Sequence, residues 1–313
     1  MKRLLFVVFL SVSAGPGWAQ VDSPDPARLK VSSANVLVLD AAADRQVYAK
    51  AADEVTPIAS VTKLMTAMVV LDARLSLDEI LDIDTGDFDY LKGSHSRLAM
   101  GSSLTRREML RLALMSSENR AASSLARHYP GGKHAFVEAM NVKAALLGMS
   151  HTHYADPTGL DAENVSTAHD LARLVQAAAE YPLIREFTTT PSYLVELQPT
   201  GRTIGFNNSN ALVKNQSWDI QLQKTGYIRE AGKCVVMLVN IASKPFVIVL
   251  LDSFGRYTRI ADAQRIKHWL ETGESLVVAA PKAAVRAVKA KVKRTSGTLK
   301  PRAVKASTRK RSC

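Results

Sequence analysis

Cysteine is scarce in this chain of 313 residues, which contains only Cys234 and Cys313. Two cysteines exclude a small secreted scaffold that several disulfides hold together. Cys234 lies in an apolar segment, where we expect a small buried hydrophobic residue and no bond to Cys313 in the terminal tail. With 47% hydrophobic and 22% charged residues, the composition is that of a globular protein with one large domain or two small ones.

The N-terminus lacks a hydrophobic run long enough to span a bilayer. Its apolar segment covers residues 4–12, whereas a spanning helix needs about 20 residues. This segment follows Lys2 and Arg3 and precedes a stretch with small residues that ends at Ala19. Such a pattern predicts a signal peptide over residues 1–19 and an exported protein, expected in the periplasm. An uncleaved membrane anchor is the alternative.

Acidic residues are missing from the C-terminal end. Residues 282–313 contain twelve Lys or Arg and no Asp or Glu, so they hold the whole excess of 41 − 29 = +12. They also lack aromatic residues and cannot bury enough apolar area to offset the entropy of ordering. We expect residues 281–313 to form a basic, disordered tail. It either binds anionic envelope surfaces in a salt-sensitive way or is a solvated extension without a partner.

Residues 20–280 are predicted to form one folded domain in which strands at both ends enclose a helical middle. We expect strands over residues 34–39, 45–49, 220–228, 234–241 and 246–251. Helices are expected over residues 60–73, after Thr105, and over residues 120–128, 133–147, 167–180 and 258–271. The predicted fold class is α/β (α+β): an antiparallel sheet built from both chain ends, with flanking helices and a helical subdomain.

The predicted helix over residues 60–73 carries a Ser-x-x-Lys pair, Ser60 and Lys63. Residues three apart lie on the same face of a helix. A serine becomes a nucleophile when a neighbouring base takes its proton, and burial among apolar residues lowers the pKa of a lysine far enough for that role. Taken alone the pair is a weak signal, because Ser60 could be a helix cap and Lys63 a surface lysine.

Two further motifs follow in the chain. Ser117 and Asn119 stand after the Thr105 helix, where they could relay a proton and hold a substrate amide, or simply end one helix and begin the next. Lys224, Thr225 and Gly226 stand on a predicted strand. They offer a second cation, a hydroxyl for a carboxylate or carbonyl, and room for a substrate backbone, although a strand glycine often marks a bulge.

The three motifs Ser-x-x-Lys, Ser-x-Asn and Lys-Thr-Gly, in this order, form the signature of penicillin-binding proteins and β-lactamases. The surrounding sequence resembles the D-alanyl-D-alanine endopeptidases, the low-molecular-mass penicillin-binding proteins of type 7. This resemblance extends over roughly residues 25–275. The segments that carry it are 57–70, 114–121, 128–132, 157–160 and 223–226.

The resemblance implies a DD-peptidase fold without metal or organic cofactor. It implies that Ser60 is acylated, that Lys63 is the base, that Ser117 relays protons and that Asn119 binds the substrate amide. Lys224, Thr225 and Gly226 would line the opposite wall, and the backbone N–H groups of Ser60 and Tyr227 would form the oxyanion hole. The implied substrate is peptidoglycan peptide, the implied covalent inhibitors are β-lactams, and nucleic acid is not an expected partner.

Several residues outside the motifs are weaker candidates for a catalytic, metal-binding or substrate-binding role. Glu163 lies in the loop where class A β-lactamases carry a catalytic glutamate, but its surroundings resemble the peptidases. His151 and His153 lack further metal ligands at a fitting spacing. Arg256 and Arg259 could face a substrate carboxylate, and a solvated helix start is the preferred interpretation.

Four functions remain open at this stage. A DD-endopeptidase that cleaves peptidoglycan cross-links is the first. A DD-carboxypeptidase that removes terminal D-Ala shares its chemistry. The third is a β-lactamase, which requires rapid hydrolysis of the acyl-enzyme. The fourth is a penicillin-binding scaffold that does not hydrolyse a substrate.

Deletion of residues 282–313 is expected to weaken association with the cell envelope and to leave acylation by a β-lactam intact. The tail carries the net positive charge, and its one motif match, Ser307 and Lys310, stands without the other two motifs in a segment that we expect to be disordered. Retention of the full-length and truncated proteins on purified sacculi, measured at increasing salt, tests the first expectation. Equal salt-dependent retention of the two proteins would contradict it.

Overall fold

The computed structural model of the protein describes residues 24–276. The predicted signal peptide and the predicted basic tail lie outside these residues. Within the described part of the chain, no helix is both long enough and apolar enough to cross a membrane.

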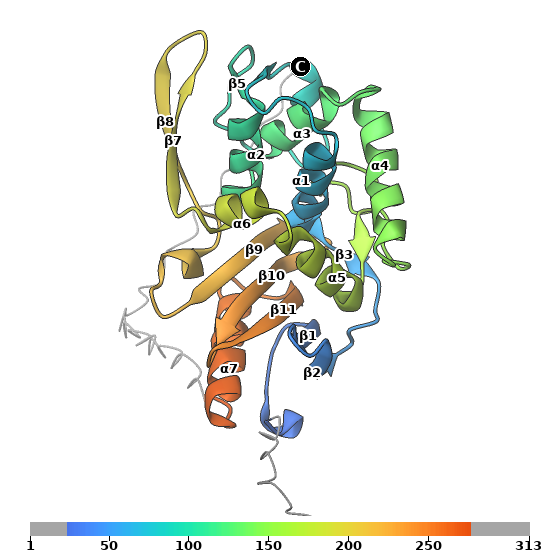
Figure 1. Ribbon diagram of the computed structural model, residues 1–313, viewed down its shortest axis with the longest axis vertical. Helices are drawn as coiled ribbons and strands as arrows, with labels where there is room; N and C mark the ends of the chain where they lie inside the picture. The colour runs from blue at the N-terminus through green and yellow to red at the C-terminus, as the bar shows by residue number, and fades with distance from the viewer. Residues whose placement is uncertain (1–23, 277–313) are drawn as a thin grey trace, which may run out of the picture. The chain divides into compact units, whose positions relative to one another are not determined.

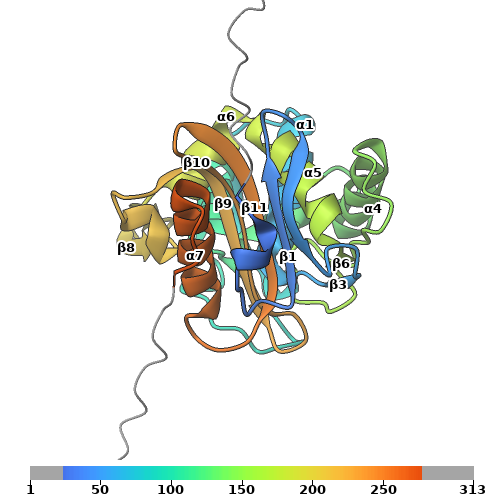
Figure 2. The same ribbon diagram turned by 90° about the horizontal axis from the view of Figure 1, so that it is seen from below.

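An antiparallel sheet of five strands forms the base of the molecule, in the order β2-β1-β11-β10-β9 (Figures 1 and 2). Its strands are β1 (Asn35–Asp40), β2 (Arg45–Lys50), β9 (Asp219–Ile228), β10 (Gly232–Ile241) and β11 (Lys244–Ser253). β1 from the N-terminal part pairs with β11 from the C-terminal part, with Asn35 opposite Leu251. The prediction of one sheet built from both chain ends is therefore confirmed, and β9 lies at its edge.

Helices cover both faces of this sheet (Figure 2). Side chains alternate between the two faces along a strand, and β1 shows this directly. Val36 and Val38 belong to an apolar cluster with Trp269 of α7 (Thr258–Thr272). Leu37 and Leu39 belong to the larger cluster on the other face, which contains α5 (Ala168–Ala179).

The larger cluster continues into a helical region above the sheet (Figure 1). Its helices are α1 (Lys63–Asp72), α2 (Arg106–Met115), α3 (Asn119–Arg127), α4 (Gly132–Leu146) and α6 (Pro182–Thr189). α1 is apolar on every side, and eight of its ten residues are buried, as that pattern predicts. The expected helix after Thr105 is confirmed as α2, and Thr105 and Glu108 form a reciprocal capping box at its start.

The predicted helix over residues 60–73 begins later than expected. Residues Ala59–Thr62 form a 3-10 turn, η2, and α1 starts only at Lys63. Ala59 has a left-handed backbone with φ +47°, which a regular helix does not accommodate. Ser60 therefore stands on the tight turn before the helix, one turn ahead of Lys63.

The segment after α5 contains structure that the sequence patterns did not reveal. α6 begins at Pro182 and has only eight residues. A two-stranded hairpin, β7 (Ser192–Leu197) and β8 (Arg202–Asn207), projects away from the sheet (Figure 1). Only two side chains of each strand are buried, so the alternation of apolar and polar residues that indicates a strand is weak here.

The remaining elements are short. They are η1 (Pro26–Arg28), β3 (Thr56–Pro57), β4 (Ile80–Asp82), η3 (Thr85–Asp87), β5 (Ser103–Thr105), β6 (Val165–Ser166) and η4 (Ala211–Lys214). β3 pairs with β6, which ties the segment before Ser60 to the loop that follows α4.

Candidate active site

Ser60 and Lys63 are in direct contact where the helical region meets the sheet. Lys63 Nζ donates to Ser60 Oγ at 2.8 Å, to Asn119 Oδ1 at 2.7 Å and to the carbonyl of Thr158 at 2.6 Å. Lys63 is completely buried, so the interpretation of it as a surface lysine is wrong. Its amine is held by acceptors from three separate segments, and one of them is the serine hydroxyl.

Burial lowers the pKa of Lys63 to about 8, although the carboxylates of Asp156 and Glu118 act in the opposite direction. An ammonium group loses its hydration in the interior, which favours the neutral amine. At neutral pH roughly one molecule in ten then carries a neutral Lys63, against fewer than about one in a thousand for a lysine in water. The neutral amine is the form that can take a proton from Ser60.

Ser117 and Asn119 approach the same point from the junction of α2 and α3. Ser117 lies in the connecting loop with φ +64°, and Asn119 is the first residue of α3. Asn119 bridges two groups, because its Oδ1 accepts from Lys63 while its Nδ2 donates to Ser94 Oγ at 2.9 Å. Ser117 Oγ accepts from Lys224 Nζ at 2.9 Å.

Lys224, Thr225 and Gly226 supply the facing wall from edge strand β9. Lys224 is fully buried, and burial together with the nearby cations Lys63 and Arg259 holds its pKa well below the usual lysine value. Thr225 Oγ1 lies 2.7 Å from Ser209 Oγ. The three predicted motifs thus converge on one place, with Lys63 and Lys224 each bonded to a different serine.

A cavity of about 510 Å³, the Ser60 cavity, opens over these groups. It is lined by Ser60, Ser117, Asn119, Thr225, Gly226 and Tyr227, and further by Lys92, Ser94, Leu160, Ser209, Ile228, Arg229 and Arg259. Its lining contains three cations and no carboxylate, although one of the cations, Lys92, pairs at 2.7 Å with Glu230 outside the lining. Tyr227 is 60% exposed, so its ring stands at the mouth. Such a cavity suits an extended peptide with a carboxylate.

Arg259 has a different position from the solvated helix start that we expected. It is half-buried, and its Nη1 donates to the carbonyls of Gly226 at 2.9 Å and Cys234 at 3.1 Å. It lies on the first turn of α7, which packs on β10 and β11, and it lines the Ser60 cavity. Arg256 is exposed and does not line this cavity.

Two glycines hold the Ala59–Ser60 peptide between them. A Cβ at Gly159 would lie 2.0 Å from the carbonyl oxygen of Ala59 and 2.8 Å from the Ser60 nitrogen. A Cβ at Gly226 would lie 3.0 Å from the Ser60 nitrogen. Gly159 also has φ +81°, a conformation that other residues rarely adopt. The backbone N–H of Ser60 is therefore positioned by close approach from two sides.

The other candidates of the sequence lie outside the Ser60 cavity. Glu163 is exposed and is not among the lining residues. His151 is exposed, and His153 makes a backbone bridge to Val165. Among residues 24–276, no three His, Cys, Asp or Glu residues gather closely enough to hold a metal ion. Cys234 is a buried free thiol.

Sequence patterns alone did not assign Ser94, Thr158, Gly159 or Ser209 to the site. Each contributes through tertiary contact: Ser94 to Asn119, Thr158 to Lys63, Gly159 to Ser60 and Ser209 to Thr225. Only the Thr-Gly pair had a signal, since it lies in the 157–160 segment that carries the family resemblance.

Comparisons with known proteins agree with this geometry. Over residues 20–255 the sequence matches the family described as D-alanyl-D-alanine carboxypeptidase. A D-alanyl-D-alanine endopeptidase of Pseudomonas aeruginosa is 50% identical over 288 residues, which cover 90% of this chain and 92% of the relative. One of Escherichia coli is 48% identical over 251 residues, or 80% and 81% of the two chains.

Solved structures show the same fold. The crystal structure of the Streptomyces K15 DD-transpeptidase is similar with a TM-score of 0.72 at 28% identity, covering 78% of this chain and 98% of that one. A penicillin-binding protein homologue of Mycobacterium tuberculosis has a TM-score of 0.69 at 26% identity, covering 82% and 97%. The predicted fold class is confirmed.

Substitution of Gly159 by alanine is expected to reduce the rate of acylation by benzylpenicillin at least about a hundredfold, because a displacement of about 1 Å in a reacting group has that effect. The new Cβ forces the Ala59–Ser60 peptide to move. The rate constant for covalent labelling measures the effect.

Gly148→Ala is the matched control. Gly148 has φ +68° but nothing within 4 Å of its Cβ position, so this variant adds only backbone strain. Both variants should lose about 1 kcal/mol or more of stability from the left-handed conformation. Equal labelling rates for the two variants would show that Gly159 does not position Ser60.

The rate of acylation by benzylpenicillin is expected to rise about tenfold per pH unit below a midpoint near pH 8 and to level off above it. The pKa of Lys63 is lowered to about 8, and only the neutral amine accepts the Ser60 proton. Stopped-flow labelling between about pH 6 and about pH 10 measures the profile.

Glu118→Gln should move that midpoint to lower pH, because the Glu118 carboxylate stabilises the ammonium form of Lys63. Glu163→Gln removes an exposed carboxylate outside the Ser60 cavity and serves as the control. A rate that is independent of pH across this range would exclude Lys63 as the base.

Proposed function

The chain belongs to the D-alanyl-D-alanine carboxypeptidase family of serine DD-peptidases, and from this premise we propose that it hydrolyses D-alanyl cross-links in peptidoglycan through an acyl-enzyme on Ser60. One observation carries the assignment of the nucleophile: a fully buried lysine amine stands 2.8 Å from the Ser60 hydroxyl. The β-lactam antibiotics acylate the same hydroxyl.

Acylation begins when the neutral amine of Lys63 takes the proton from Ser60 Oγ. The oxygen attacks the carbonyl carbon of the D-alanine residue, and the carbonyl oxygen becomes negatively charged. The backbone N–H groups of Ser60 and Tyr227 stabilise this charge. Gly159 and Gly226 support that role, because both glycines approach the Ser60 nitrogen closely.

The leaving amine then needs a proton. Ser117 is suited to relay it, because its hydroxyl is bonded to Lys224 and faces the cavity that contains Ser60. Ser117 gives its proton to the amine and receives in return the proton that Lys63 took from Ser60, so Lys63 is neutral again for deacylation. Collapse of the tetrahedral intermediate breaks the carbon–nitrogen bond and leaves the D-alanyl ester on Ser60. Asn119 holds the substrate amide while its Oδ1 keeps Lys63 in place.

The cationic side of the Ser60 cavity receives the carboxylate of the leaving group. Arg259 and the hydroxyl of Thr225 both line it. In a cross-link, the leaving amine belongs to a residue with its own carboxylate, so the same contacts serve endopeptidase and carboxypeptidase reactions. Endopeptidase activity is favoured because two close relatives carry that name.

Deacylation requires a water molecule in place of the leaving amine, with Lys63 again as the base. Glu163 is exposed and does not line the Ser60 cavity, so it is not placed to activate a water molecule beside the Ser60 ester. We therefore expect slow release of β-lactam adducts and not the rapid turnover of a β-lactamase. The predicted signal peptide supports a periplasmic location, where this substrate lies.

Digestion of purified cross-linked muropeptide dimers is expected to yield monomers, and Ser60→Ala should reduce the rate at least about ten-thousandfold, the order of loss that removal of a nucleophile produces. Liquid chromatography of the products measures this. Pentapeptide monomers digested in parallel report carboxypeptidase activity.

Mass spectrometry after benzylpenicillin treatment should show one adduct, mapped to the peptide that contains Ser60. An unmodified Ser60 peptide in folded protein would contradict the proposed mechanism. A labelled protein that cleaves neither substrate faster than Ser60→Ala would instead be a penicillin-binding scaffold.

A further inference from the structure

The rim of the Ser60 cavity continues onto the end of the sheet, across strands β9, β10 and β11. Tyr227 of β9 lies opposite Lys233 of β10, and Lys233 lies opposite Ser253 at the end of β11. Lys233 Nζ stands 3.9 Å from the centroid of the Tyr227 ring. Because Tyr227 also lines the Ser60 cavity, this row of residues begins at the mouth of the cavity.

The turn that leads from β11 into α7 adds exposed aromatic side chains next to this row. Phe254 is 92% exposed and Tyr257 is 67% exposed. The Arg256 guanidinium lies 5.4 Å from the centroid of the Tyr257 ring. Three aromatic rings and two cations therefore gather beside the cavity. We call them the Arg256 surface, which consists of Tyr227, Lys233, Phe254, Arg256 and Tyr257.

The cations of the Arg256 surface lie close to one another and to Arg259 at the cavity rim. Burial lowers the pKa of Lys233, and the positive charges of Arg259 and Arg256 lower it further. Within residues 24–276, none of these three cations forms an ion pair with a carboxylate. A ligand that carries several carboxylates would relieve their mutual repulsion.

Few carboxylates of the chain itself offset this positive charge. Three carboxylates stand close to the three cations in the sequence. Of these, Glu230 pairs with Lys92 at 2.7 Å. Asp262 pairs with Arg265 at 2.6 Å. Only Asp252 remains, so the surface keeps a positive charge.

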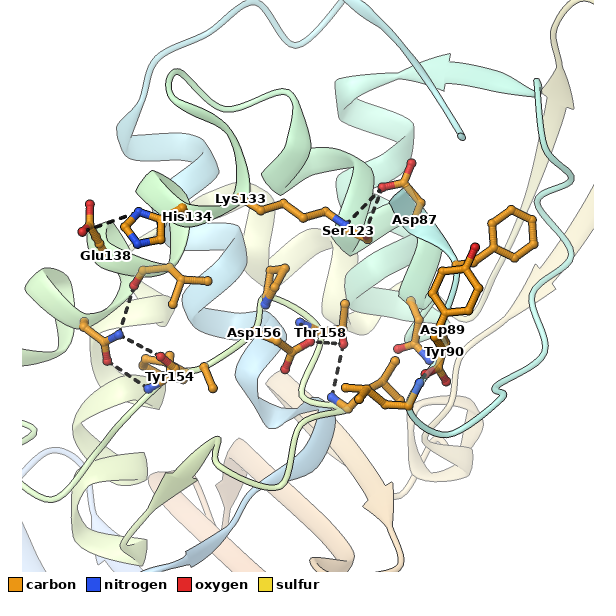
Figure 3. A pocket seen from close by; sticks show the side chains of 18 of the residues that line it. Asp87, Asp89, Tyr90, Ser123, Lys133, His134, Glu138, Tyr154, Asp156 and Thr158 are labelled. Atoms are coloured by element: carbon orange, nitrogen blue, oxygen red, sulfur yellow. Dashed lines mark hydrogen bonds and ion pairs between the residues drawn. The ribbon is translucent and has the colours of Figure 1, made fainter. Parts of the chain in front are cut away.

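The opposite side of the Ser60 cavity has the opposite charge. A second cavity of about 530 Å³ shares Asn119 and Leu160 with the Ser60 cavity. Its lining contains four carboxylates and one lysine (Figure 3). No residue of the Arg256 surface lines it. An anionic chain that leaves the Ser60 cavity is therefore attracted to the Arg256 surface and repelled on the other side.

We propose that the Arg256 surface binds the second peptide of a cross-link, the part of the substrate that leaves with the amine when Ser60 is acylated. This inference rests on the proposed function and names the part of the substrate by which cross-links are selected. Arg259 receives the carboxylate of the leaving residue, and the Arg256 surface begins beside it. The rest of that peptide carries further carboxylates for Lys233 and Arg256, and its apolar parts cover the aromatic rings.

The two reactions of the family differ in this leaving group. In a carboxypeptidase reaction it is a single D-alanine, which ends at Arg259 inside the cavity. In an endopeptidase reaction the leaving residue continues into a second peptide, which passes out over the rim. The Arg256 surface therefore contributes to the binding of cross-linked dimers and not of pentapeptides. A lipid bilayer is a poorer fit, because it would also cover Tyr227 at the mouth of the cavity.

The test is the ratio of kcat/KM for cross-linked muropeptide dimers to kcat/KM for pentapeptide monomers. Arg256→Glu should lower this ratio about fivefold at low salt, and the loss should shrink as salt screens the charges. Phe254→Ala should lower the ratio about threefold at every salt concentration, because the contact of the ring is apolar. Neither side chain lines the Ser60 cavity, so pentapeptide cleavage and acylation by benzylpenicillin should keep their wild-type rates.

Arg185→Glu is the matched control. Arg185 is exposed on α6 and lines neither cavity, so the same reversal of charge should leave the ratio unchanged. A modified dimer is the complementary probe, in which the second peptide has an amide in place of one carboxylate beyond the leaving residue. The wild-type protein should cleave it more slowly than the unmodified dimer, and Arg256→Glu should have a smaller effect on it.

Three results would overturn the inference: a ratio that both Arg256→Glu and Phe254→Ala leave at its wild-type value, an equal loss on dimer and pentapeptide, or an equal effect of Arg185→Glu. Weaker binding of the first two variants to vesicles of anionic phospholipid, with an unchanged ratio, would assign the surface to a membrane instead. A failure of the proposed function differs from all of these, because neither substrate would then be cleaved faster than by Ser60→Ala.

Discussion

A lysine without solvent contact, held against a serine hydroxyl, is the constraint on which the rest of the site depends. Lys63 has no exposed surface, and burial moves its pKa from 10.5 to about 8. That change corresponds to about 3 kcal/mol by which the interior disfavours the ammonium form. The folded state tolerates a buried lysine here because Ser60, Asn119 and Thr158 all accept hydrogen bonds from its amine.

A second buried lysine completes the site. Lys224 reaches it from the edge strand β9 and donates to Ser117, and burial together with the nearby Lys63 and Arg259 holds the pKa of Lys224 well below the usual lysine value. The helical region supplies Lys63 and the sheet supplies Lys224, so the site exists only where the two regions meet. Gly159 comes from the helical region and Gly226 from the sheet. Because neither has a side chain, both regions can approach the backbone of Ser60 closely.

The lining of the Ser60 cavity carries charge of one sign, because Lys92, Arg229 and Arg259 contribute to it and no carboxylate does. Such a lining is complementary to an anionic group. Asn119 lines this cavity, accepts a hydrogen bond from Lys63 through Oδ1 and donates one to Ser94 through Nδ2, so one side chain connects the cavity wall to the buried amine.

The sequence by itself determined the strands at both ends, a buried helix that begins beside Ser60, and three motifs with local spacing, but not α6 or the hairpin of β7 and β8. These follow from periodicity and from residues close in the chain, which local patterns record. Only the tertiary structure decided the placement of Arg259 in the Ser60 cavity and the left-handed turn at Ala59. It also decided the contacts of Thr158 and Gly159 with the Lys63 and Ser60 segment. Those contacts join segments far apart in the sequence, and their specificity arises from close packing that no local pattern encodes.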